Sequence, residues 1–385
     1  MKSGHKRQIL GPVIVPIMAA GLLVQAAVPL ARIQTTYATL DLGLGAQAIA
    51  FLPAAFAILP VFLTVALGRI NDRGGARITV LAGGLSILVA TAMLMLMPPS
   101  FAMLLLGTSI LGIGQTLVLA ALQLMISRSS SVAHRDAMLG NYMVAISLGQ
   151  AIGPLFVGGT GGRFVIPFIG AALLMVAVLV LFRLAPKKRR AAVGTPIPLS
   201  HIASTRGLPW LIVIGSICVA SQDLVLAFLP VLGSERGIEP ATIGLLLTLR
   251  AIAAVVSRIF FSHAVARFGR MRVMLGASAI GGLGLLILGL PLPLWGLAVA
   301  MITTGFGVGI ALTSTVALTL VVAPPAASGT ALSLRLTANR IAQFTIPLGA
   351  GVVVGPFGAA GVLAVSGAVL LAITTLRPTA LVKDI

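Results

Sequence analysis

Apolar runs of about 20 residues recur along almost the whole chain, with short polar connections between them. A helix of that length crosses a hydrocarbon core of about 30 Å, because each residue adds about 1.5 Å. The pattern therefore predicts twelve membrane-spanning helices. Their approximate limits are 9–31, 45–67, 78–97, 101–126, 137–159, 164–184, 208–232, 241–265, 273–291, 294–322, 329–353 and 359–376.

The second group of six predicted spans repeats the first. Glycine, glutamine and proline landmarks of the two groups coincide at a shift of about 193 residues. The pairs are Gly112 with Gly305, Gly114 with Gly307, Gln150 with Gln343, Pro154 with Pro347, and Gly158 with Gly351. Because six is an even number of spans, both copies have the same orientation, which predicts a pseudo-two-fold axis along the membrane normal. We expect an all-α membrane protein of two pseudo-symmetric six-helix bundles, residues 1–184 and 208–385, joined by a cytoplasmic linker at 185–207.

Charge and composition agree with this picture. Charged residues make up 9% of the chain, against about 25% in soluble domains, and the mean hydropathy is +1.13. If the N-terminus is cytoplasmic, most of the 26 Lys and Arg residues fall in inside segments, and only Arg32, Arg163 and Arg236 fall in outside segments. This asymmetry follows the positive-inside rule, so both termini are expected in the cytoplasm. The net charge of +19 thus orients a multi-pass protein of the cell membrane, and no nucleic-acid partner is expected.

Asp223, in the seventh predicted span, is the only carboxylate predicted to lie within the bilayer. Ionisable groups are costly at that depth and mark functional sites. A rise of about 1.5 Å per residue puts Asp223, Arg340 and Arg250 about 22, 17 and 16 Å from the inner edge of a core of about 30 Å. All three lie near mid-depth. Arg258 and Arg335 lie closer to the cytoplasm, where their side chains either extend to water or serve an inner gate.

An Asp223 side chain with Arg250 or Arg340 close by forms either a structural ion pair or a switchable site. Burial favours the neutral carboxyl whereas a neighbouring arginine favours the carboxylate, and the sequence leaves both open. Our hypothesis is that protonation of Asp223 frees an arginine or a substrate contact and so biases a conformational equilibrium. Neutral polar residues within the spans are further candidates to line a cavity, although hydrogen bonds between helices explain them equally well. They include Gln25, Gln115, Asn339 and Gln343.

The loop between the second and third predicted spans reads "GRINDRGGAR" from residue 68. It keeps the pattern G-x-L-a-D-R-x-G-R-K, except that Ala76 replaces the first basic residue of the final pair. The matching positions are Gly68, Ile70, Asp72, Arg73, Gly75 and Arg77. Near the positive end of a helix, and with arginines beside it, an aspartate carboxylate is stabilised.

The fifth predicted span contains "GNYMVAISLGQAIGPLFVGG", residues 140–159. In lipid, small residues let helix backbones approach closely, and a proline is expected to bend the helix. The stretch keeps the spacing G-x8-G-x3-G-P-x2-G-G up to the proline, whereas its last two glycines come one residue late. Its residues are Gly140, Gly149, Gly153, Pro154, Gly158 and Gly159. Tight packing against a neighbouring span is a plainer explanation of the same glycines.

On these two motifs the chain resembles the major facilitator superfamily over essentially its whole length, and the second motif resembles its twelve-span drug:proton antiporters. The resemblance implies a transporter that exports a small organic molecule by alternating access in exchange for protons. It also implies that Asp72 contacts the start of the eleventh span, near Ser328, and latches the two halves in one state. The chain departs from the antiporters at Thr108, where their fourth span has an arginine, and in a first span that has no acidic residue.

Other functions are open to different degrees. An importer or uniporter with the same fold, for a small metabolite that is anionic or amphipathic, is the main alternative. An enzyme is not expected, since the four histidines lie in tails, in loops or at a span end, and only one carboxylate is buried. We find no ATP-binding motif and expect no cofactor or metal. The expected partners are the bilayer, a small-molecule substrate and the proton, and the expected state is a monomer.

Overall fold

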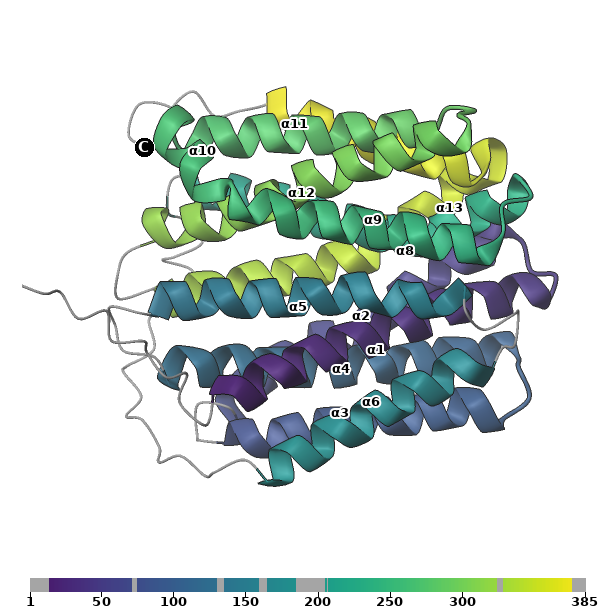
Figure 1. Ribbon diagram of the computed structural model, residues 1–385, viewed down its shortest axis with the longest axis horizontal. Coiled ribbons are helices and arrows are strands. Elements are labelled where there is room, and N and C mark those ends of the chain that lie inside the picture. Colours follow the sequence, from purple (N-terminus) through teal and green to yellow (C-terminus); the bar gives the residue numbers. More distant parts are fainter. Residues whose placement is uncertain are drawn as a thin grey trace, which may run out of the picture.

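The computed structural model describes residues 14–70, 75–129, 135–158, 165–184, 205, 207–323 and 328–375. This part of the chain is helical, with short turns and no strand (Figure 1). The helices are α1 (Ile14–Asp41), α2 (Ala46–Ile70), α3 (Ala76–Leu96), α4 (Phe101–Ser129), α5 (Arg135–Gly158), α6 (Val165–Leu184), α8 (Leu208–Glu235), α9 (Pro240–Ile259), α10 (Phe261–Phe268), α11 (Arg270–Leu288), α12 (Leu294–Val322) and α13 (Ser328–Thr375). Among the described residues, nine helices are long and apolar enough to cross a membrane.

These helices account for the twelve predicted spans. The eighth span consists of α9 and α10, and α13 contains both the eleventh and the twelfth. The two halves of α13 meet at Gly358, whose φ of 64° and ψ of −171° suit a residue without a Cβ. Directly after it, the backbone N–H of Ala359 donates a hydrogen bond of 3.3 Å to Oε1 of Glu235. This bond ties the kink in α13 to the end of α8.

The first span is longer than the sequence predicts. Helix α1 continues to Asp41, so Arg32 lies inside the helix, 9% exposed, and its predicted place in an outside segment is wrong. The polar residues that follow Arg32 resemble a loop in sequence, but they remain helical and buried. Thr35 and Thr36 donate their hydroxyl hydrogens to the carbonyl oxygen of Arg32, at 2.8 and 3.3 Å. Since the helix backbone satisfies these hydroxyl groups, the segment can be buried without a solvent partner.

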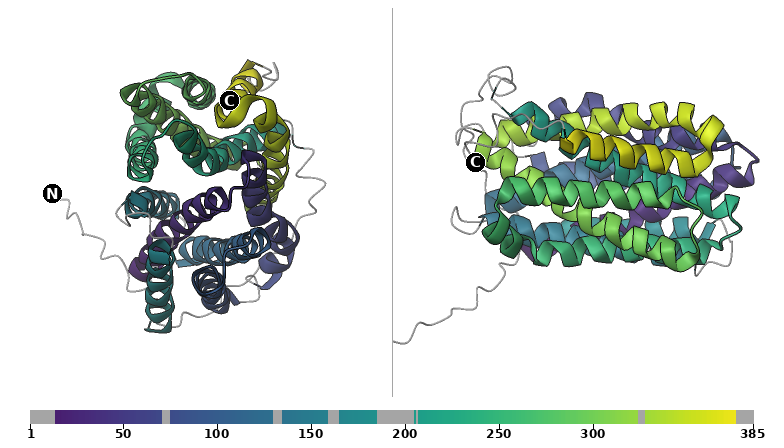
Figure 2. Two further views of the ribbon diagram at one scale, coloured as in Figure 1. Left: turned by 90° about the vertical axis from the view of Figure 1, so that its right-hand side faces the viewer. Right: turned by 90° about the horizontal axis from the view of Figure 1, so that it is seen from above.

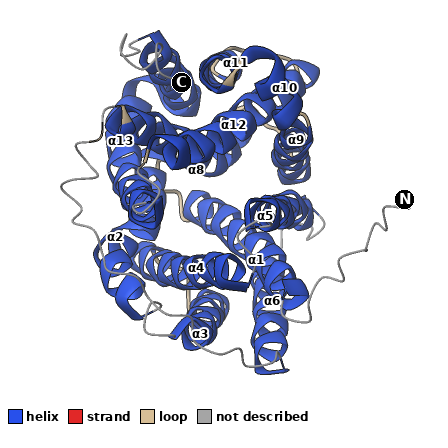
Figure 3. Cartoon of the chain, turned by 90° about the vertical axis from the view of Figure 1, so that its left-hand side faces the viewer, coloured by secondary structure: helices blue, strands red, loops and turns tan. Residues whose placement is uncertain are grey.

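Two six-helix bundles lie side by side, α1–α6 and α8–α13 (Figures 2 and 3). One apolar core lies within the first bundle and includes Phe56, Phe168 and Phe182. The other core fills the second bundle and extends to Leu30 and Ile33 of α1. The predicted fold is confirmed. The domain limits at residues 184 and 208 stay a prediction, because apart from residues 205 and 207 the linker lies outside the described residues.

Close helix contacts recur at equivalent places in the two bundles. A Cβ atom added to Gly112 of α4 would overlap the carbonyl oxygen of Phe56 in α2. A Cβ atom added to Gly305 of α12 would overlap the carbonyl oxygen of Arg250 in α9. The glycines therefore let backbones meet directly, as small residues do in membrane helix packing. At this contact the two copies of the predicted repeat pack in the same way.

The molecule has two ends, which we name by charge. At the basic end, α1 begins and α10 meets α11, and Arg267, Arg270 and Arg272 are exposed. At the opposite end, α1 finishes and α13 kinks at Gly358. In Figure 1 the basic end is on the left, and Figure 3 views the molecule from that end.

The two bundles contact each other closely in the half nearer the opposite end. The hydroxyl of Thr248 in α9 donates to the carbonyl oxygen of Ala151 in α5 at 3.0 Å. On the other flank, α2 packs against α13, and a Cβ atom on Gly355 would lie 2.8 Å from Nε2 of Gln47. The opposite half of the molecule is therefore closed by direct contacts between the bundles.

Candidate functional site

A cavity of about 820 Å³ lies between the two bundles. It is lined by α1, α4 and α5 of the first bundle and by α8–α13 of the second. It extends from Asp223 to the basic end, where Gly140 and Arg270 line it and are exposed. The structure thus combines a cavity that reaches the basic end with a closed opposite half.

The structure brings the predicted polar candidates together around this cavity. Nine of them line it, although they come from five helices spread over both halves of the chain. They are Gln25, Gln115, Asp223, Arg250, Arg258, Arg335, Asn339, Arg340 and Gln343. Sequence analysis missed Arg32, Arg270 and Tyr142, which also line it.

Asp223 is bound from both bundles. Nη1 of Arg32 in α1 lies 2.6 Å from Oδ1 of Asp223 in α8 and forms an ion pair with it. Nε2 of Gln343 in α13 donates to Oδ2 at 2.5 Å, and Nη1 of Arg340 donates to Oε1 of Gln343 at 3.0 Å. The expected partner, Arg250 or Arg340, is therefore replaced by Arg32, and Arg340 reaches the carboxylate through Gln343. The salt bridge between Arg32 and Asp223 thus joins the two bundles.

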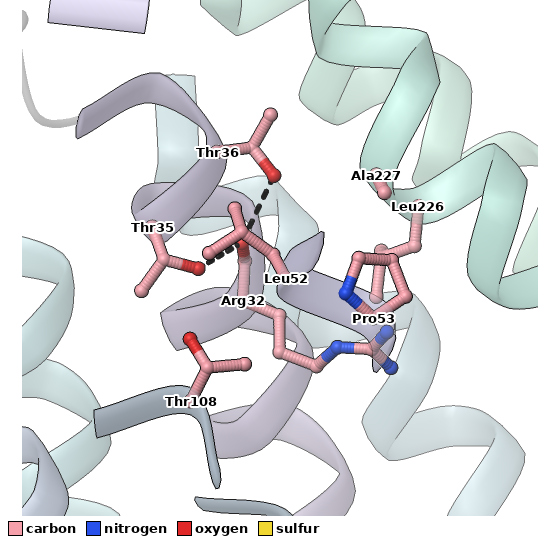
Figure 4. A pocket seen from close by; sticks show the side chains of 8 residues that line it. All are labelled: Arg32, Thr35, Thr36, Leu52, Pro53, Thr108, Leu226 and Ala227. Atoms are coloured by element: carbon pink, nitrogen blue, oxygen red, sulfur yellow. Dashed lines mark hydrogen bonds between the residues drawn. The ribbon is translucent and has the colours of Figure 1, made fainter. Parts of the chain in front are cut away.

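Packing holds Arg32 in this position. Its guanidinium carbon lies 4.2 Å from the ring centre of Phe56 in α2, within the range of a cation–π contact. A second pocket of about 10 Å³, enough for about one water molecule, adjoins Arg32 (Figure 4). Thr108 lines this pocket with Thr35 and Thr36. The position where the antiporter pattern has an arginine thus adjoins the arginine that α1 supplies.

The remaining predicted arginines have few partners. The side chain of Arg250 is 8% exposed, and its Nε has no hydrogen-bond partner among the described residues. Nη2 of Arg335 donates to the hydroxyl of Thr315 at 3.2 Å. Nη1 of Arg258 lies 3.4 Å from the carbonyl oxygen of Met143 across the bundle interface, a long hydrogen bond near the basic end.

Neutral polar side chains form hydrogen bonds around the same cavity. Nε2 of Gln115 in α4 donates to Oε1 of Gln25 in α1 at 2.7 Å. The hydroxyl of Tyr142 in α5 is buried and has no hydrogen-bond partner within the described part of the chain. In the second bundle, Ser216 donates to Oδ1 of Asn339 at 3.0 Å. The first bundle therefore contributes Arg32 with amide and hydroxyl groups, and the other five arginines that line the cavity come from the second bundle.

A profile of the Major Facilitator Superfamily matches residues 7–237 and 211–383 of the chain. The chain belongs to the major facilitator superfamily. Proteins of this superfamily are membrane transporters, and the two matches together cover nearly the whole chain.

Several solved transporter structures have the same fold as this superfamily member. A POT family transporter in complex with 5-aminolevulinic acid has a TM-score of 0.80 at 15% identity, over 94% of each chain. A D-xylose-proton symporter has a TM-score of 0.76 at 15% identity, over 95% of this chain and 96% of that one. The human organic anion transporter MFSD10 (TETRAN) has a TM-score of 0.68 at 16% identity, over 95% and 98%. No curated protein matches the chain in sequence.

The loop motif of the superfamily is described only at its edges. Gly68 lies in the last turn of α2, Gly75 directly precedes α3, and Arg77 is partly buried in the first turn of α3. Asp72 and Arg73 lie outside the described residues. The latch between this loop and the start of α13 stays a prediction.

The glycine motif of α5 serves two different contacts. Cβ atoms added to Gly149 and Gly153 would overlap the carbonyl oxygens of Leu22 and Ala26 in α1, so these glycines pack α5 against α1 within the first bundle. Gly140 has open space beside it, Gly158 ends α5 and Gly159 lies outside the described residues. The carbonyl oxygen of Pro154 faces the second bundle, where a Cβ atom on Gly244 would lie 2.5 Å from it.

A Gly244→Ala variant is therefore expected to disfavour the closed opposite half, because its methyl group overlaps the Pro154 carbonyl oxygen between the bundles. Overpacking of this kind costs about 1–3 kcal/mol. Spin labels at Leu42 and Ser234, introduced after Cys218→Ser, should show a larger share of long distances across that end. Gly276→Ala, which has open space around it, should leave the distances unchanged. If both variants gave the same distribution of spin-label distances, the contact between Gly244 and Pro154 would not favour the closed opposite half.

Proposed function

We propose that the protein is a secondary active transporter that moves a small organic molecule across the cell membrane by alternating access and couples this movement to protons. The Arg32–Asp223 ion pair carries the proposal, because it joins the two bundles at the closed end of a cavity that reaches the basic end. In secondary transporters, cargo and coupling-ion sites lie near the bilayer midplane between the two repeats. The pair can therefore link cargo, proton and conformation.

Asp223 is the group that we expect to take up the proton. In the described state its two oxygens accept hydrogen bonds from Arg32 and Gln343. A proton on Asp223 removes its negative charge, so Arg32 loses the Coulombic attraction that holds α1 against α8. Since these helices belong to different bundles, the loss weakens the closed half and favours opening at the opposite end.

Orientation and gating belong to the same proposal. Exposed arginines at the basic end favour a cytoplasmic location for it, so the described state would receive its cargo from the cytoplasm. Arg258 reaches across the bundle interface near that end, which supports it as an inner-gate residue, with Arg335 as the second candidate.

The direction of coupling is a separate question. The sequence of the fifth span predicts export in exchange for protons. However, Gly149 and Gly153 pack α5 against α1 within one bundle, which suits either direction. The excess of arginines over carboxylates in the cavity favours the second candidate, proton-driven uptake of an anionic metabolite.

Purified protein in liposomes that contain a pH-sensitive dye would test the coupling. Small organic acids, amides and amines are added under proton gradients of either direction, with protein-free liposomes as the control. Acidification of the lumen during cargo uptake would indicate cotransport, and alkalinisation would indicate exchange. Cargo movement without any proton movement would refute the proposed coupling.

A further inference from the structure

The cavity carries far more positive than negative charge. Six arginines line it, and Asp223 is the one carboxylate among the described residues that do so. The arginines come from α1, α9, α11 and α13 and are Arg32, Arg250, Arg258, Arg270, Arg335 and Arg340. One carboxylate cannot compensate this charge.

Moreover, the carboxylate of Asp223 already has partners on both of its oxygens. Each of its oxygens accepts a hydrogen bond, one from Arg32 and one from Gln343. Arg250 and Arg340 lie near enough to interact electrostatically with Asp223, but neither forms a salt bridge with it. Arg250 is more than nine-tenths buried, and its Nε has no partner among the residues described. A guanidinium in this situation is unfavourable until an anion pairs with it.

We propose that the cargo is a small organic anion whose charged group binds Arg250 and Arg340 beside Asp223. This inference rests on the proposed transport function and identifies the class of its cargo. Carboxylate, sulfonate and phosphate groups match the planar fork of guanidinium donors. A cationic cargo would meet repulsion from all six arginines.

The remainder of the cavity fits an organic body and not a bare inorganic ion. Its volume of about 820 Å³ lies in the usual range for organic ligands. Leu312, Val316 and Leu320 of α12 give it an apolar wall, and Met143 and Ile146 of α5 give it another. The Gln25–Gln115 pair can bind a neutral polar group of the cargo, and so can the hydroxyl of Tyr142, which has no partner among the described residues.

Proton and cargo would then bind together. Arg32 of α1 and Gln343 of α13 contact Asp223, and Arg250 of α9 and Arg340 of α13 interact with it electrostatically. The cavity-lining residues described on α12 include no charged group, and α2 contributes none to the lining. The anion and Asp223 compete for the same arginines, so a proton on Asp223 removes the competitor. Anion binding should therefore strengthen as the pH falls, and by reciprocity the anion should promote proton uptake.

Binding to purified protein in lipid nanodiscs tests this inference without any need for transport. Calorimetry compares compounds that share an apolar body, a butyl, phenyl or octyl group, and differ in the head group, which is a carboxylate, sulfonate, amide or amine. We expect at least one acid to bind more tightly than its amide and amine, and more tightly at lower pH. If no acid binds more tightly than its own amide and amine, the anion site is refuted.

Variants connect that binding to the two arginines. Arg250→Gln and Arg340→Gln should each weaken acid binding at least about tenfold, while Arg250→Lys should retain part of it. Arg272→Gln, at an exposed arginine away from the cavity, should bind as the parent does. Equal acid affinity in the parent and both glutamine variants would overturn the assignment. Thermal unfolding without ligand establishes that each variant is folded.

The two proposals fail in different ways. Acid binding that depends on Arg250 and Arg340, but with no proton movement in liposomes, refutes the coupling and leaves the anion site standing. Proton-coupled transport of an amide or amine refutes the anion site and leaves the transporter standing.

Discussion

An Asp223→Asn variant is expected to transport without any response to a pH gradient. Asparagine keeps the shape of the side chain and a hydrogen-bond acceptor for Arg32, but it takes up no proton and carries no charge. In the parent, the carboxylate holds Arg32 at 2.6 Å across the bundle interface. Loss of one member of a buried pair costs about 3–5 kcal/mol, so the closed opposite half should also become less populated.

Liposome uptake at several imposed gradients measures this effect. The uptake rate of the parent should increase with the proton gradient, and that of the variant should not. Anion binding by the variant should be tight and independent of pH. Asp223→Glu keeps a titratable group and should retain part of the response. If transport by Asp223→Asn depended on the proton gradient as transport by the parent does, Asp223 would not be the proton acceptor.

A double-mutant cycle separates the ion pair from the two single effects. Arg32→Gln alone leaves Asp223 without its interbundle partner, and the double variant removes both charges. If the pair holds the bundles together, the double variant should be destabilised by less than the sum of the single variants. Additive effects would show that Arg32 and Asp223 do not act as a unit.

The fold was predictable because its signals extend over many residues. Twelve apolar runs, a repeat at a shift of about 193 residues and the glycines that repeat with it all specify the same architecture. Gly112 and Gly305, matched by spacing alone, make equivalent backbone contacts in the two bundles. Patterns of this kind tolerate errors of a few residues at each helix end.

The centre of the site was predictable in part. Asp223 and the arginines of α9 and α13 are conspicuous as charges within apolar runs, and they line one cavity. Arg32 is not evident as a site residue because Gln34, Thr35 and Thr36 follow it and lower the hydropathy, so the pattern predicts that the span ends at residue 31. Burial of those hydroxyls through helix carbonyls is a tertiary outcome that hydropathy does not register.

A signal for Arg32 was nevertheless present in the repeat. Arg32 and Asp223 are 191 residues apart, close to the shift of about 193 that relates the two halves. They therefore occupy nearly equivalent positions on the first helix of each repeat. A pseudo-two-fold axis brings such positions face to face where the two helices pass near the axis, and opposite charges there predict an ion pair.

A Gly305→Ala variant is expected to lose much of its folded state. The added methyl group would overlap the carbonyl oxygen of Arg250, and both helices must move because backbone atoms cannot rotate away. We expect a loss of about 3 kcal/mol or more in the free energy of unfolding, at the upper end of overpacking effects, together with weaker anion binding because α9 carries Arg250.

The repeat supplies a second test of the same idea. Gly112→Ala should be about as damaging as Gly305→Ala, since its methyl group would overlap the carbonyl oxygen of Phe56 at the equivalent contact, and this would also disturb the ring that packs against Arg32. Gly276→Ala is the matched control, because nothing lies near its added methyl group and alanine favours a helix by about 1 kcal/mol. In detergent, the unfolding temperatures of Gly112→Ala and Gly305→Ala should lie well below that of the parent. The unfolding temperature of Gly276→Ala should equal or exceed that of the parent. If all three unfold together, direct backbone contact at these glycines does not hold the bundles in shape.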